Sequence, residues 1–285
     1  MRIAVKANLT REFAASTAHS VIGKLKEYGA EVLIDEATKD EFPEENAGCM
    51  LPLEDCVDRC DALIAIGGDG TILHAGKTAA RHGKPILGIN AGRLAFMAGL
   101  ERGELDRLKD LLDGNYTLDK RMLLEVLLFD EKGGCLDRID CMNDVVFTRA
   151  VNRNIIDVSV ESNGRFVNEY RGDGVIFSTP TGSTAYALAA GGPVINPTIE
   201  SILLTPICSH SFNRHSIVFR PDERMTVFAS KSDETELCLS CDGEPPILIR
   251  PGCCTVVQRS RTTAEFIRIK QDNFIEIFNS KMTHP

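Results

Sequence analysis

The chain has 285 residues, of which 43% are hydrophobic and 26% charged, a length sufficient for two domains that each bury a core. Its formal net charge of −9 argues against a general nucleic-acid-binding protein, because such proteins neutralise phosphates with clustered Lys and Arg. The longest apolar runs, at residues 62–66 and 123–129, have only the length of strands. We therefore expect a soluble, cytoplasmic protein without nucleic-acid or membrane partners.

Ten cysteines raise the question of a zinc site. Cys238 and Cys241 form one CxxC pair, but Cys253 and Cys254 are adjacent and would point to opposite faces of a strand. A zinc ribbon usually has two spaced pairs. We therefore expect reduced, mostly buried thiols and no metal ligands among the side chains.

Strands and helices alternate in the first part of the chain. Short apolar runs predict strands at residues 3–5, 32–34, 62–66 and 86–89. The first predicted helix ends at Gly29, and its apolar face carries Ala14, Ala18, Val21, Ile22 and Leu25. An acidic, Pro-containing loop is predicted before residue 62, and a further helix begins near Thr71. This βαβ alternation predicts a Rossmann-like α/β domain whose largely parallel sheet binds ligands at the carboxyl ends of its strands.

From about Leu123 the pattern becomes that of a β-rich, sandwich-like domain. Val158 and Val160 alternate with polar residues, and Asn163-Gly164 predicts a hairpin turn before a returning strand at residues 166–167. Further strands are predicted at residues 175–177, 217–219, 226–228, 237–239, 247–249 and 254–257. We expect the α/β domain to span residues 1–118, completed by residues 262–285, and the β-rich domain to span residues 119–261, with the boundary near residues 115–121.

A glycine-rich loop, GGDGT at residues 67–71, directly follows one predicted strand and precedes a helix. Its glycines permit positive φ and allow backbone N–H groups to approach phosphate oxygens. The alternative interpretation is a tight turn in which Asp69 caps the helix. A dinucleotide fingerprint would need glycine at Leu73, and a Walker A motif ending at residues 76–78 would need glycine at Thr71. The loop therefore favours phosphate binding of another kind.

A second chemical motif is the run YRGDGVIFSTPTGSTAY at residues 170–186, which continues to Gly-Gly-Pro at residues 191–193. A strand leads into a hydroxyl-rich loop and a short helix predicted at residues 185–190. Hydroxyls such as that of Ser183 could bind ribose and amide groups, and Tyr186 could stack on a flat ring. The alternative is a capped strand-to-helix connection with Tyr186 in the core.

Asn143 and Asp144 precede the apolar run Val-Val-Phe. An amide beside a carboxylate could bind an adenine edge and a ribose hydroxyl, whereas the alternative is simply a polar start of a strand.

These motifs together resemble those of the NAD kinase family. GGDGT after a buried strand is similar to the loop shared by NAD kinases, diacylglycerol and sphingosine kinases, and 6-phosphofructokinases. Residues 170–193 resemble the longest NAD kinase motif, which the lipid kinases and phosphofructokinases lack. Asn143-Asp144, residues 206–211 and residues 242–244 match shorter family segments in the same order. The resemblance covers nearly the whole chain.

The resemblance implies transfer of the γ-phosphoryl group of ATP, or of a polyphosphate, to the adenosine 2′-hydroxyl of NAD, giving NADP. It implies a divalent cation such as Mg²⁺, a homodimer or homotetramer, and NAD binding by the β-rich domain. Asp69 would be the general base. The implied substrate-binding residues are Gly67, Gly68, Gly70, Thr71, His74, Asn143, Asp144, Arg171, Asp173, Thr181, Thr184, Ala185, Tyr186, Ala189, Cys208 and Glu244.

Two other functions remain open at this point: another kinase of the same superfamily, and an NAD(P)-binding sensor without catalysis. The chain also departs from the family pattern. Ala95 interrupts a usual Leu-Gly-Phe sequence, Ser209 stands where Pro is common, and Glu244 replaces a usual Gln. A carboxylate at 244 loses the amide donor and adds charge near a polyanion. His74 has an alternative as an ordinary helix-surface histidine.

Overall fold

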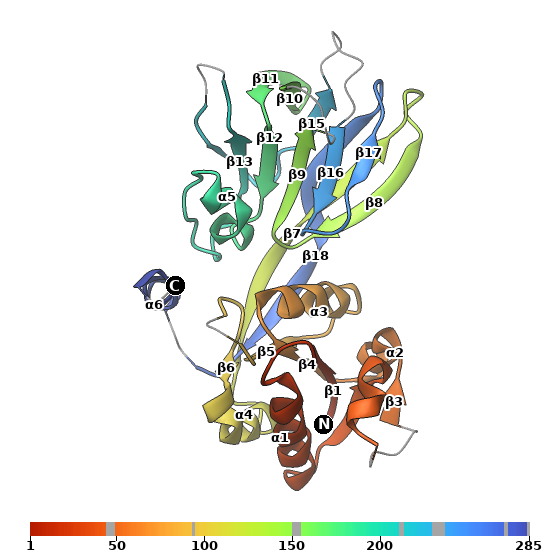
Figure 1. The fold of residues 1–285 in the computed structure, drawn as a ribbon, viewed down its shortest axis with the longest axis vertical. Helices are drawn as coiled ribbons and strands as arrows, with labels where there is room; N and C mark the ends of the chain where they lie inside the picture. Colours follow the sequence, from red (N-terminus) through yellow and green to blue (C-terminus); the bar gives the residue numbers. More distant parts are fainter. Residues whose placement is uncertain are drawn as a thin grey trace. The chain divides into compact units, whose positions relative to one another are not determined.

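The computed structural model describes residues 1–43, 49–92, 95–149, 155–210, 214–229, 237–270 and 273–283 (Figure 1). The chain divides into two compact units, one comprising Met1–Lys120 with Thr263–Pro285 and the other Arg121–Thr262. Strands β7 (Thr117–Phe129) and β18 (Cys254–Arg268) each begin in one unit and end in the other. The chain therefore passes twice between the units, and its last segment belongs to the first unit.

The first unit is built on a parallel sheet with strand order β3-β2-β1-β4-β5. The short strand β6 and the last part of β18 also pair in parallel with β5. The elements are β1 (Arg2–Ala7), α1 (Ala14–Glu27), β2 (Glu31–Asp35), η1 (Glu36–Glu41), β3 (Met50–Leu51), α2 (Leu53–Arg59), β4 (Ala62–Gly67), α3 (Asp69–Arg81), β5 (Ile86–Asn90), β6 (Leu100–Glu101), η3 (Arg102–Arg107), α4 (Leu108–Leu112) and α6 (Phe274–Thr283). After β1 the chain continues to β2 on one side of the sheet, and after β4 it continues to β5 on the other side. The carboxyl ends of the adjacent strands β1 and β4 are therefore the topological switch point, where sheets of this kind bind ligands.

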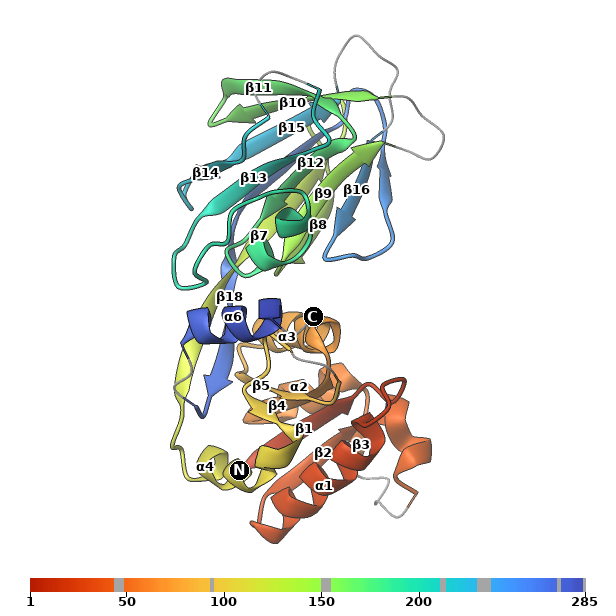
Figure 2. The ribbon, with the colours of Figure 1, turned by 60° about the vertical axis from the view of Figure 1, so that its left-hand side comes forward.

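Helices lie on both faces of this sheet, with α1 and α3 on opposite sides of the strands (Figure 2). α1 contacts β1, β2 and β4, and it packs with η3 and α4. The apolar face predicted for α1 is confirmed, because all five of its residues are buried. Gly29 follows the helix with φ of +81°, a left-handed conformation that glycine adopts without strain.

The segment predicted as an acidic loop before β4 is not a loop, so that prediction is wrong. Its described residues form η1, β3 and α2. α2 buries only Cys56 and Val57, too few apolar positions for a helical period to be recognised in the sequence. Pro52 directly precedes the helix, and acidic residues occupy its first turn. Proline and acidic residues indicate a loop, but both are also favoured at the start of a helix.

The second unit has two sheets that share one core. The first is antiparallel throughout, with the order β14-β13-β12-β9-β16-β17, and the second runs β11-β10-β15-β18-β7-β8. Phe147 and Phe177 from the first sheet and Val158 and Val227 from the second belong to the same buried cluster. The remaining elements are β8 (Cys135–Cys141), β9 (Asp144–Arg149), β10 (Ile156–Ser162), β11 (Arg165–Gly172), β12 (Gly174–Ser178), η4 (Gly182–Thr184), α5 (Tyr186–Ala189), β13 (Ile202–Ile207), β14 (Ile217–Phe219), β15 (Met225–Ala229), β16 (Leu237–Cys241) and β17 (Ile247–Ile249).

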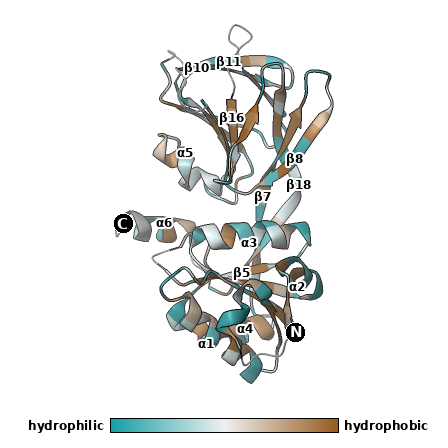
Figure 3. Cartoon of the chain, turned by 45° about the vertical axis from the view of Figure 1, so that its right-hand side comes forward, coloured by the Kyte–Doolittle hydropathy of each residue, from teal (hydrophilic) through white to brown (hydrophobic). Residues whose placement is uncertain are grey.

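An α/β first unit followed by a β-rich second unit confirms the predicted fold class. The predicted hairpin is also confirmed, since Asn163 and Gly164 connect β10 and β11 with φ values of +50° and +74°. Strands β8 and β13 were not expected. β8 is exposed along most of its length and lacks an alternation of buried apolar residues, whereas β13 contains Pro206 although it is buried throughout. Figure 3 shows that hydrophobic residues concentrate on the strands.

All ten cysteines are free thiols. Among the described residues, no three His, Cys, Asp or Glu side chains gather in a group that could hold a metal ion. Within the same part of the chain, no helix combines the length and the apolar character needed to cross a membrane.

Candidate active site

The glycine-rich loop joins the end of β4 to the start of α3, at the switch point of the parallel sheet. A β-carbon at Gly67 would lie 2.5 Å from the hydroxyl oxygen of Thr71, so a larger residue does not fit there. At Gly68 and Gly70, an added β-carbon would meet no atom of the described structure within 4 Å. The backbone beside these two glycines is therefore open, and it lies at a helix N-terminus, where an anion is favoured.

Asn8 is a residue of this loop region that the sequence motifs do not reveal. It follows β1, its N–H donates to the carbonyl of Ile66 at 3.0 Å, and its side-chain amide donates to the hydroxyl of Thr71 at 3.1 Å. Thr71 is itself buried. Asn8 therefore fixes the hydroxyl of the loop from the neighbouring strand. Only the pairing of β1 with β4 brings Asn8 to this position, and that pairing is not visible in the sequence.

Asp69 is the first residue of α3, and its carboxylate is held by a segment that lies far along the chain. Its two oxygens accept hydrogen bonds from the backbone N–H groups of Phe96 (3.0 Å) and Met97 (2.9 Å). The N-cap position belongs to Gly68, and no side chain caps the helix there. The carboxylate therefore does not serve as the helix cap. These two backbone donors fix the orientation of the carboxylate.

Arg268 in β18 holds the segment that binds Asp69. Its guanidinium donates to the carbonyls of Ala98 at 3.0 Å and Met97 at 3.4 Å, and to the carboxylate of Asp119 at 3.1 Å. The side chains of Arg268 and Asp119 are only 17% and 20% exposed, so this ion pair is better shielded from water than a surface pair. Arg268 thus acts on Asp69 through the intervening backbone.

His74 lies one turn further along α3 and is exposed. Its carbonyl accepts a hydrogen bond from the hydroxyl of Thr78 at 3.5 Å. The imidazole is exposed one turn after the glycine-rich loop. This position suits a ligand-binding residue and an ordinary surface histidine equally well.

In the second unit, the Asn143-Asp144 pair contacts the hydroxyl-rich loop after β12. The carbonyl of Asn143 accepts the N–H of Thr179 at 2.9 Å, and the Thr179 hydroxyl donates to the carbonyl of Met142 at 2.6 Å. A β-carbon at Gly182 would lie 2.0 Å from the carbonyl oxygen of Asn143, so only glycine permits this approach. The structure therefore brings together two motifs that are well separated in the sequence.

The hydroxyls of the second motif divide into supporting and accessible groups. Ser183 is fully buried, and its hydroxyl accepts the N–H of Ile195 at 3.0 Å, so it stabilises the loop. The Thr184 hydroxyl donates to the carbonyl of Thr181 at 3.2 Å, and the Thr181 hydroxyl accepts from Arg121 at 3.1 Å. Both threonines are only partly buried, which leaves them accessible to a ligand.

Tyr186 begins α5 and is 45% exposed, so the interpretation of this residue as part of the core is wrong. Ala187 takes the buried position of this short helix instead. Ala185 directly precedes the helix and is partly buried, and Ala189 is the last residue of the helix and is exposed. The aromatic ring therefore has solvent beside it and small neighbours, which suits stacking against a flat ligand.

Asp144 is buried at the start of β9. Burial and then the negative charge of Asp242 raise the pKa of Asp144 to about 7, and the backbone N–H of Tyr186 opposes this shift by hydrogen bonding to the carboxylate. A buried carboxyl with a strongly raised pKa in a loop cluster is a common mark of a functional site.

Arg171, Asp173 and Cys208 form a separate group at the other end of β9 and β12. Asp173 pairs with Arg149 at 3.3 Å, and its N–H donates to the carbonyl of Ile207, next to Cys208. Asp144 pairs with Ser178 and Thr148 pairs with Gly174, so the two groups are roughly 15 Å apart at 3.3 Å per residue. The second unit of one chain therefore does not bring all of its predicted site residues together.

Family models match most of the chain. The N-terminal domain of ATP-NAD kinase matches residues 3–116, and the C-terminal domain of ATP-NAD kinase matches residues 142–269. The NAD kinase of Symbiobacterium thermophilum is 34% identical over 283 residues, which cover 99% of each chain. This chain belongs to the NAD kinase family. The resemblance seen in the motifs is thereby confirmed.

Other NAD kinases show the same relationship. The NAD kinase of Legionella pneumophila strain Corby is 33% identical and covers 93% of this chain and 89% of its own. The crystal structure of yeast NADH kinase complexed with NADH has a TM-score of 0.89 and 23% identity, and it covers 100% of this chain and 88% of the yeast chain. An NAD kinase from Archaeoglobus fulgidus in complex with ATP has a TM-score of 0.77, 24% identity and 99% coverage of both chains. These two structures show a shared fold.

The departures from the NAD kinase pattern differ in burial: Glu244 is exposed, Ser209 is partly buried and Ala95 is buried. Glu244 is exposed in the turn after β16, where its carbonyl accepts the Ser240 hydroxyl at 2.8 Å. Ala95 immediately precedes Phe96, which binds Asp69, and the residues just before Ala95 lie outside the described part of the chain. Neither Glu244 nor Ala95 interrupts the hydrogen bonds that hold Asp69 or the Asn143 loop.

Proposed function

We propose that this chain transfers the γ-phosphoryl group of ATP to the adenosine 2′-hydroxyl of NAD, producing NADP. The proposal rests mainly on Asp69, whose carboxylate is held by two backbone N–H donors at the switch point of the sheet. The chain belongs to the NAD kinase family, which supports the same reaction. Asp69 stands directly beside Gly68 and Gly70, whose open backbone can receive phosphates.

In the proposed reaction, Asp69 is the general base. Its carboxylate takes the proton from the 2′-hydroxyl as the new oxygen–phosphorus bond forms, and the bond between the γ-phosphorus and the bridging oxygen breaks to release ADP. The hydrogen bonds from Phe96 and Met97 hold the carboxylate in a fixed orientation, which reduces the reorganisation needed in the transition state.

The donor phosphates would lie on the glycine-rich loop. Backbone N–H groups at Gly68 and Gly70 would face the phosphate oxygens, Gly67 permits the tight contact with Thr71, and His74 would lie beside the donor.

In the part of the chain that the structure describes, no three His, Cys, Asp or Glu side chains could hold a metal ion together, and we propose a Mg²⁺ ion held by substrate phosphates and water. Such an ion supplies charge neutralisation at the phosphoryl group.

NAD would bind to the second unit. We assign its adenosine half to Asn143 and Asp144, with the Asp144 carboxylate accepting a ribose hydroxyl and the Asn143 amide pairing with the base. Tyr186 would stack on a ring of the ligand between Ala185 and Ala189, and the Thr181 and Thr184 hydroxyls would bind polar groups. Glu244 lies on the turn after β16 that also carries Asp242, whose carboxylate binds the backbone of Asn143 and Asp144.

The separate group of Arg171, Asp173 and Cys208 leads us to propose a site shared between copies of the chain. Its distance from Asp144 within one second unit is explained if these residues complete the NAD site of a neighbouring copy. We therefore propose a homodimer or homotetramer in the cytoplasm. Light scattering after size-exclusion chromatography measures the subunit number, and a monomer with full activity would contradict the shared site.

A coupled assay tests the function. Purified protein is incubated with NAD, ATP and Mg²⁺, and NADP is read out with an NADP-specific dehydrogenase. We expect NADP in proportion to enzyme and time, and no NADP when ATP is omitted or Mg²⁺ is chelated. Parallel reactions with NADH and with polyphosphate define the acceptor and the donor. No NADP under any of these conditions would refute the proposed function.

A further inference from the structure

Asp242 lies in the turn between β16 and β17 but is bound to the loop before β9. Its carboxylate accepts hydrogen bonds from the backbone N–H groups of Met142 (2.9 Å), Asn143 (2.7 Å) and Asp144 (3.2 Å). The N–H of Asp242 in turn donates to the carbonyl of Asp144 at 2.9 Å. One side chain therefore binds three consecutive peptide groups of a segment about one hundred residues earlier, which spans the proposed adenosine-binding pair.

These contacts fix the Asn143-Asp144 backbone from one side, and the hydroxyl-rich loop fixes it from the other. The N–H groups point to Asp242, whereas the carbonyl of Asn143 accepts from Thr179 at 2.9 Å. Because both the N–H and the C=O groups of this segment are hydrogen-bonded, the backbone conformation is fixed without a ligand. The orientation of the Asn143 and Asp144 side chains from the backbone is therefore fixed as well. Charged hydrogen bonds of this kind are stronger than neutral ones.

The carboxylate at 242 is present despite an electrostatic cost. It lies close enough to Asp144 to disfavour the ionised form of that buried residue. Asp242 also has φ of +53° and is followed by Gly243 at +73°, a turn in which asparagine is equally at home. Asparagine would avoid the repulsion, but its amide has a single acceptor oxygen and its NH₂ group would face the donors. The turn alone does not explain an aspartate here, whereas three backbone donors do.

We propose that Asp242 is a positioning residue for NAD: its carboxylate holds the Asn143-Asp144 backbone in the conformation that presents both side chains to the adenosine half. This inference rests on the proposed function, because it names what orders one part of that site.

The variant Asp242→Asn isolates the carboxylate, because it keeps the turn and the size of the side chain. We expect the KM for NAD to rise at least about tenfold, while the KM for ATP stays within about twofold and kcat within about threefold. A loss confined to the KM for NAD is the pattern of weakened substrate binding, which a general loss of folded protein does not produce.

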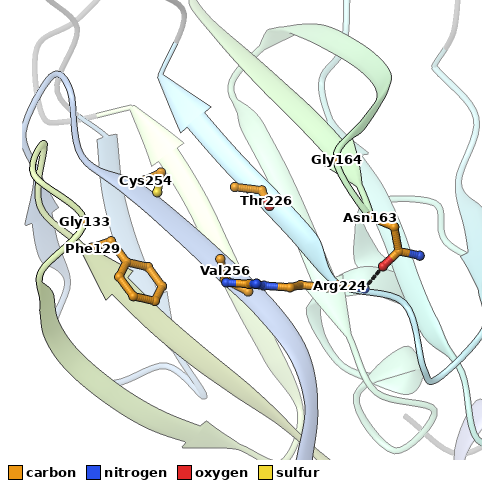
Figure 4. Close-up of a pocket in the computed structure, with 8 residues that line it drawn as sticks. All are labelled: Phe129, Gly133, Asn163, Gly164, Arg224, Thr226, Cys254 and Val256. Atoms are coloured by element: carbon orange, nitrogen blue, oxygen red, sulfur yellow. Dashed lines mark hydrogen bonds between the residues drawn. The ribbon is translucent and has the colours of Figure 1, made fainter.

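Asn163 offers a matched control. Like Asp242, it lies in a turn of the second unit, has a positive φ and is followed by a glycine. Its side-chain oxygen accepts the backbone N–H of Arg224 at 3.1 Å, drawn as the dashed line in Figure 4. Asn163→Ala therefore removes an equivalent turn contact in the same unit. Both alanine variants are assayed at a temperature at which both are folded. Asn163→Ala should leave the KM for NAD within about twofold of the wild-type value, whereas Asp242→Ala should raise it.

The outcomes separate cleanly. If wild-type protein forms NADP but Asp242→Asn keeps its KM for NAD within twofold, the positioning role is refuted and the proposed function stands. If Asn163→Ala and Asp242→Ala raise the KM equally, the effect of Asp242 is structural and the inference fails. Should Asp242→Asn not fold, Asp242→Glu keeps the charge but displaces it by one methylene. It must then raise the KM for NAD at least about threefold, and an unchanged KM would overturn the inference.

Discussion

Asp69 in the first unit and Asp242 in the second are bound in the same way, yet we assign them opposite roles. Each is an aspartate whose carboxylate accepts backbone N–H groups from a segment distant in sequence, two for Asp69 and three for Asp242. At Asp69 the backbone holds the carboxylate, which stands beside an open glycine-rich loop. At Asp242 the carboxylate holds the backbone, and the neighbouring side chains of Asn143 and Asp144 face the ligand in our proposal.

The comparison shows that a hydrogen-bond pattern does not define a role by itself. What distinguishes the two aspartates is their neighbours: Asp69 lies between two glycines that have space for a ligand, whereas Asp242 lies near the buried carboxyl group of Asp144. Removing charge from the first should therefore abolish chemistry, whereas removing charge from the second should weaken binding. The variants below test this contrast.

The largest effect is expected for Asp69→Asn. The amide cannot accept the 2′-hydroxyl proton, so kcat should fall on the order of 10²- to 10⁴-fold, the usual contribution of a general base. The coupled assay measures kcat, and circular dichroism with a thermal melt shows that the variant is folded. A folded Asp69→Asn enzyme with kcat within about threefold of wild type would remove Asp69 from this role.

A smaller effect is expected for Arg268→Gln, which loosens the segment that donates to Asp69. We expect kcat to fall about tenfold, with the KM for NAD within threefold and partial recovery in Arg268→Lys. Arg107→Gln is the control, because Arg107 also donates to a carbonyl, that of Ile269 at 3.1 Å, and to a carboxylate, that of Asp110, in the same unit. Equal loss of kcat in both variants would contradict the positioning of Asp69 by Arg268.

Asp144→Asn should change how stability depends on pH. Burial and the charge of Asp242 raise the pKa of Asp144 from 3.8 to about 7. Between these values the folded protein holds a proton that the unfolded chain has lost, so this residue makes the protein less stable as the pH rises to about 7. Asparagine removes the penalty. The Tm of the variant relative to wild type should therefore rise by several degrees from pH 5 to pH 8. A difference in Tm that does not vary with pH would contradict this titration.

The smallest effect is expected for Glu244→Gln, which restores the usual family residue. The amide regains a donor and removes negative charge near a polyanionic ligand, so the KM for NAD should fall about two- to fivefold, the worth of one modest hydrogen bond. Glu131→Gln, on the turn between β7 and β8, changes the same charge elsewhere in the unit. An increase in the KM for NAD of Glu244→Gln would show that the carboxylate is itself a binding group.

Features that depend on short stretches of sequence were predictable. The glycine-rich loop, the α1 face and the Asn163-Gly164 hairpin each follow from neighbouring residues. The order of predicted strands and helices indicated the fold class, and the family motifs added the relationship to NAD kinases. Local composition misled at α2, where proline and acidic residues begin a helix rather than a loop.

Contacts between distant segments were not predictable. Nothing near Asn8 indicates that its amide meets Thr71, because this depends on the strand order. Likewise, Arg268 meets the Phe96 segment only because β18 returns to the first sheet beside β5. The proposed roles of Asp69, Asp242 and Glu244 are tested by the variants above, and the shared site of Arg171, Asp173 and Cys208 is tested by the subunit number.

The return of β18 to the first unit has a consequence for how the protein is made. The loop that carries Asp69 leaves the ribosome early, but Arg268, which holds the donors to Asp69, lies near the end of the chain. A chain interrupted before residue 268 would contain the whole glycine-rich loop without the residue that orders its carboxylate. If Asp69 is the general base, a chain that stops before residue 268 should therefore be a poor catalyst.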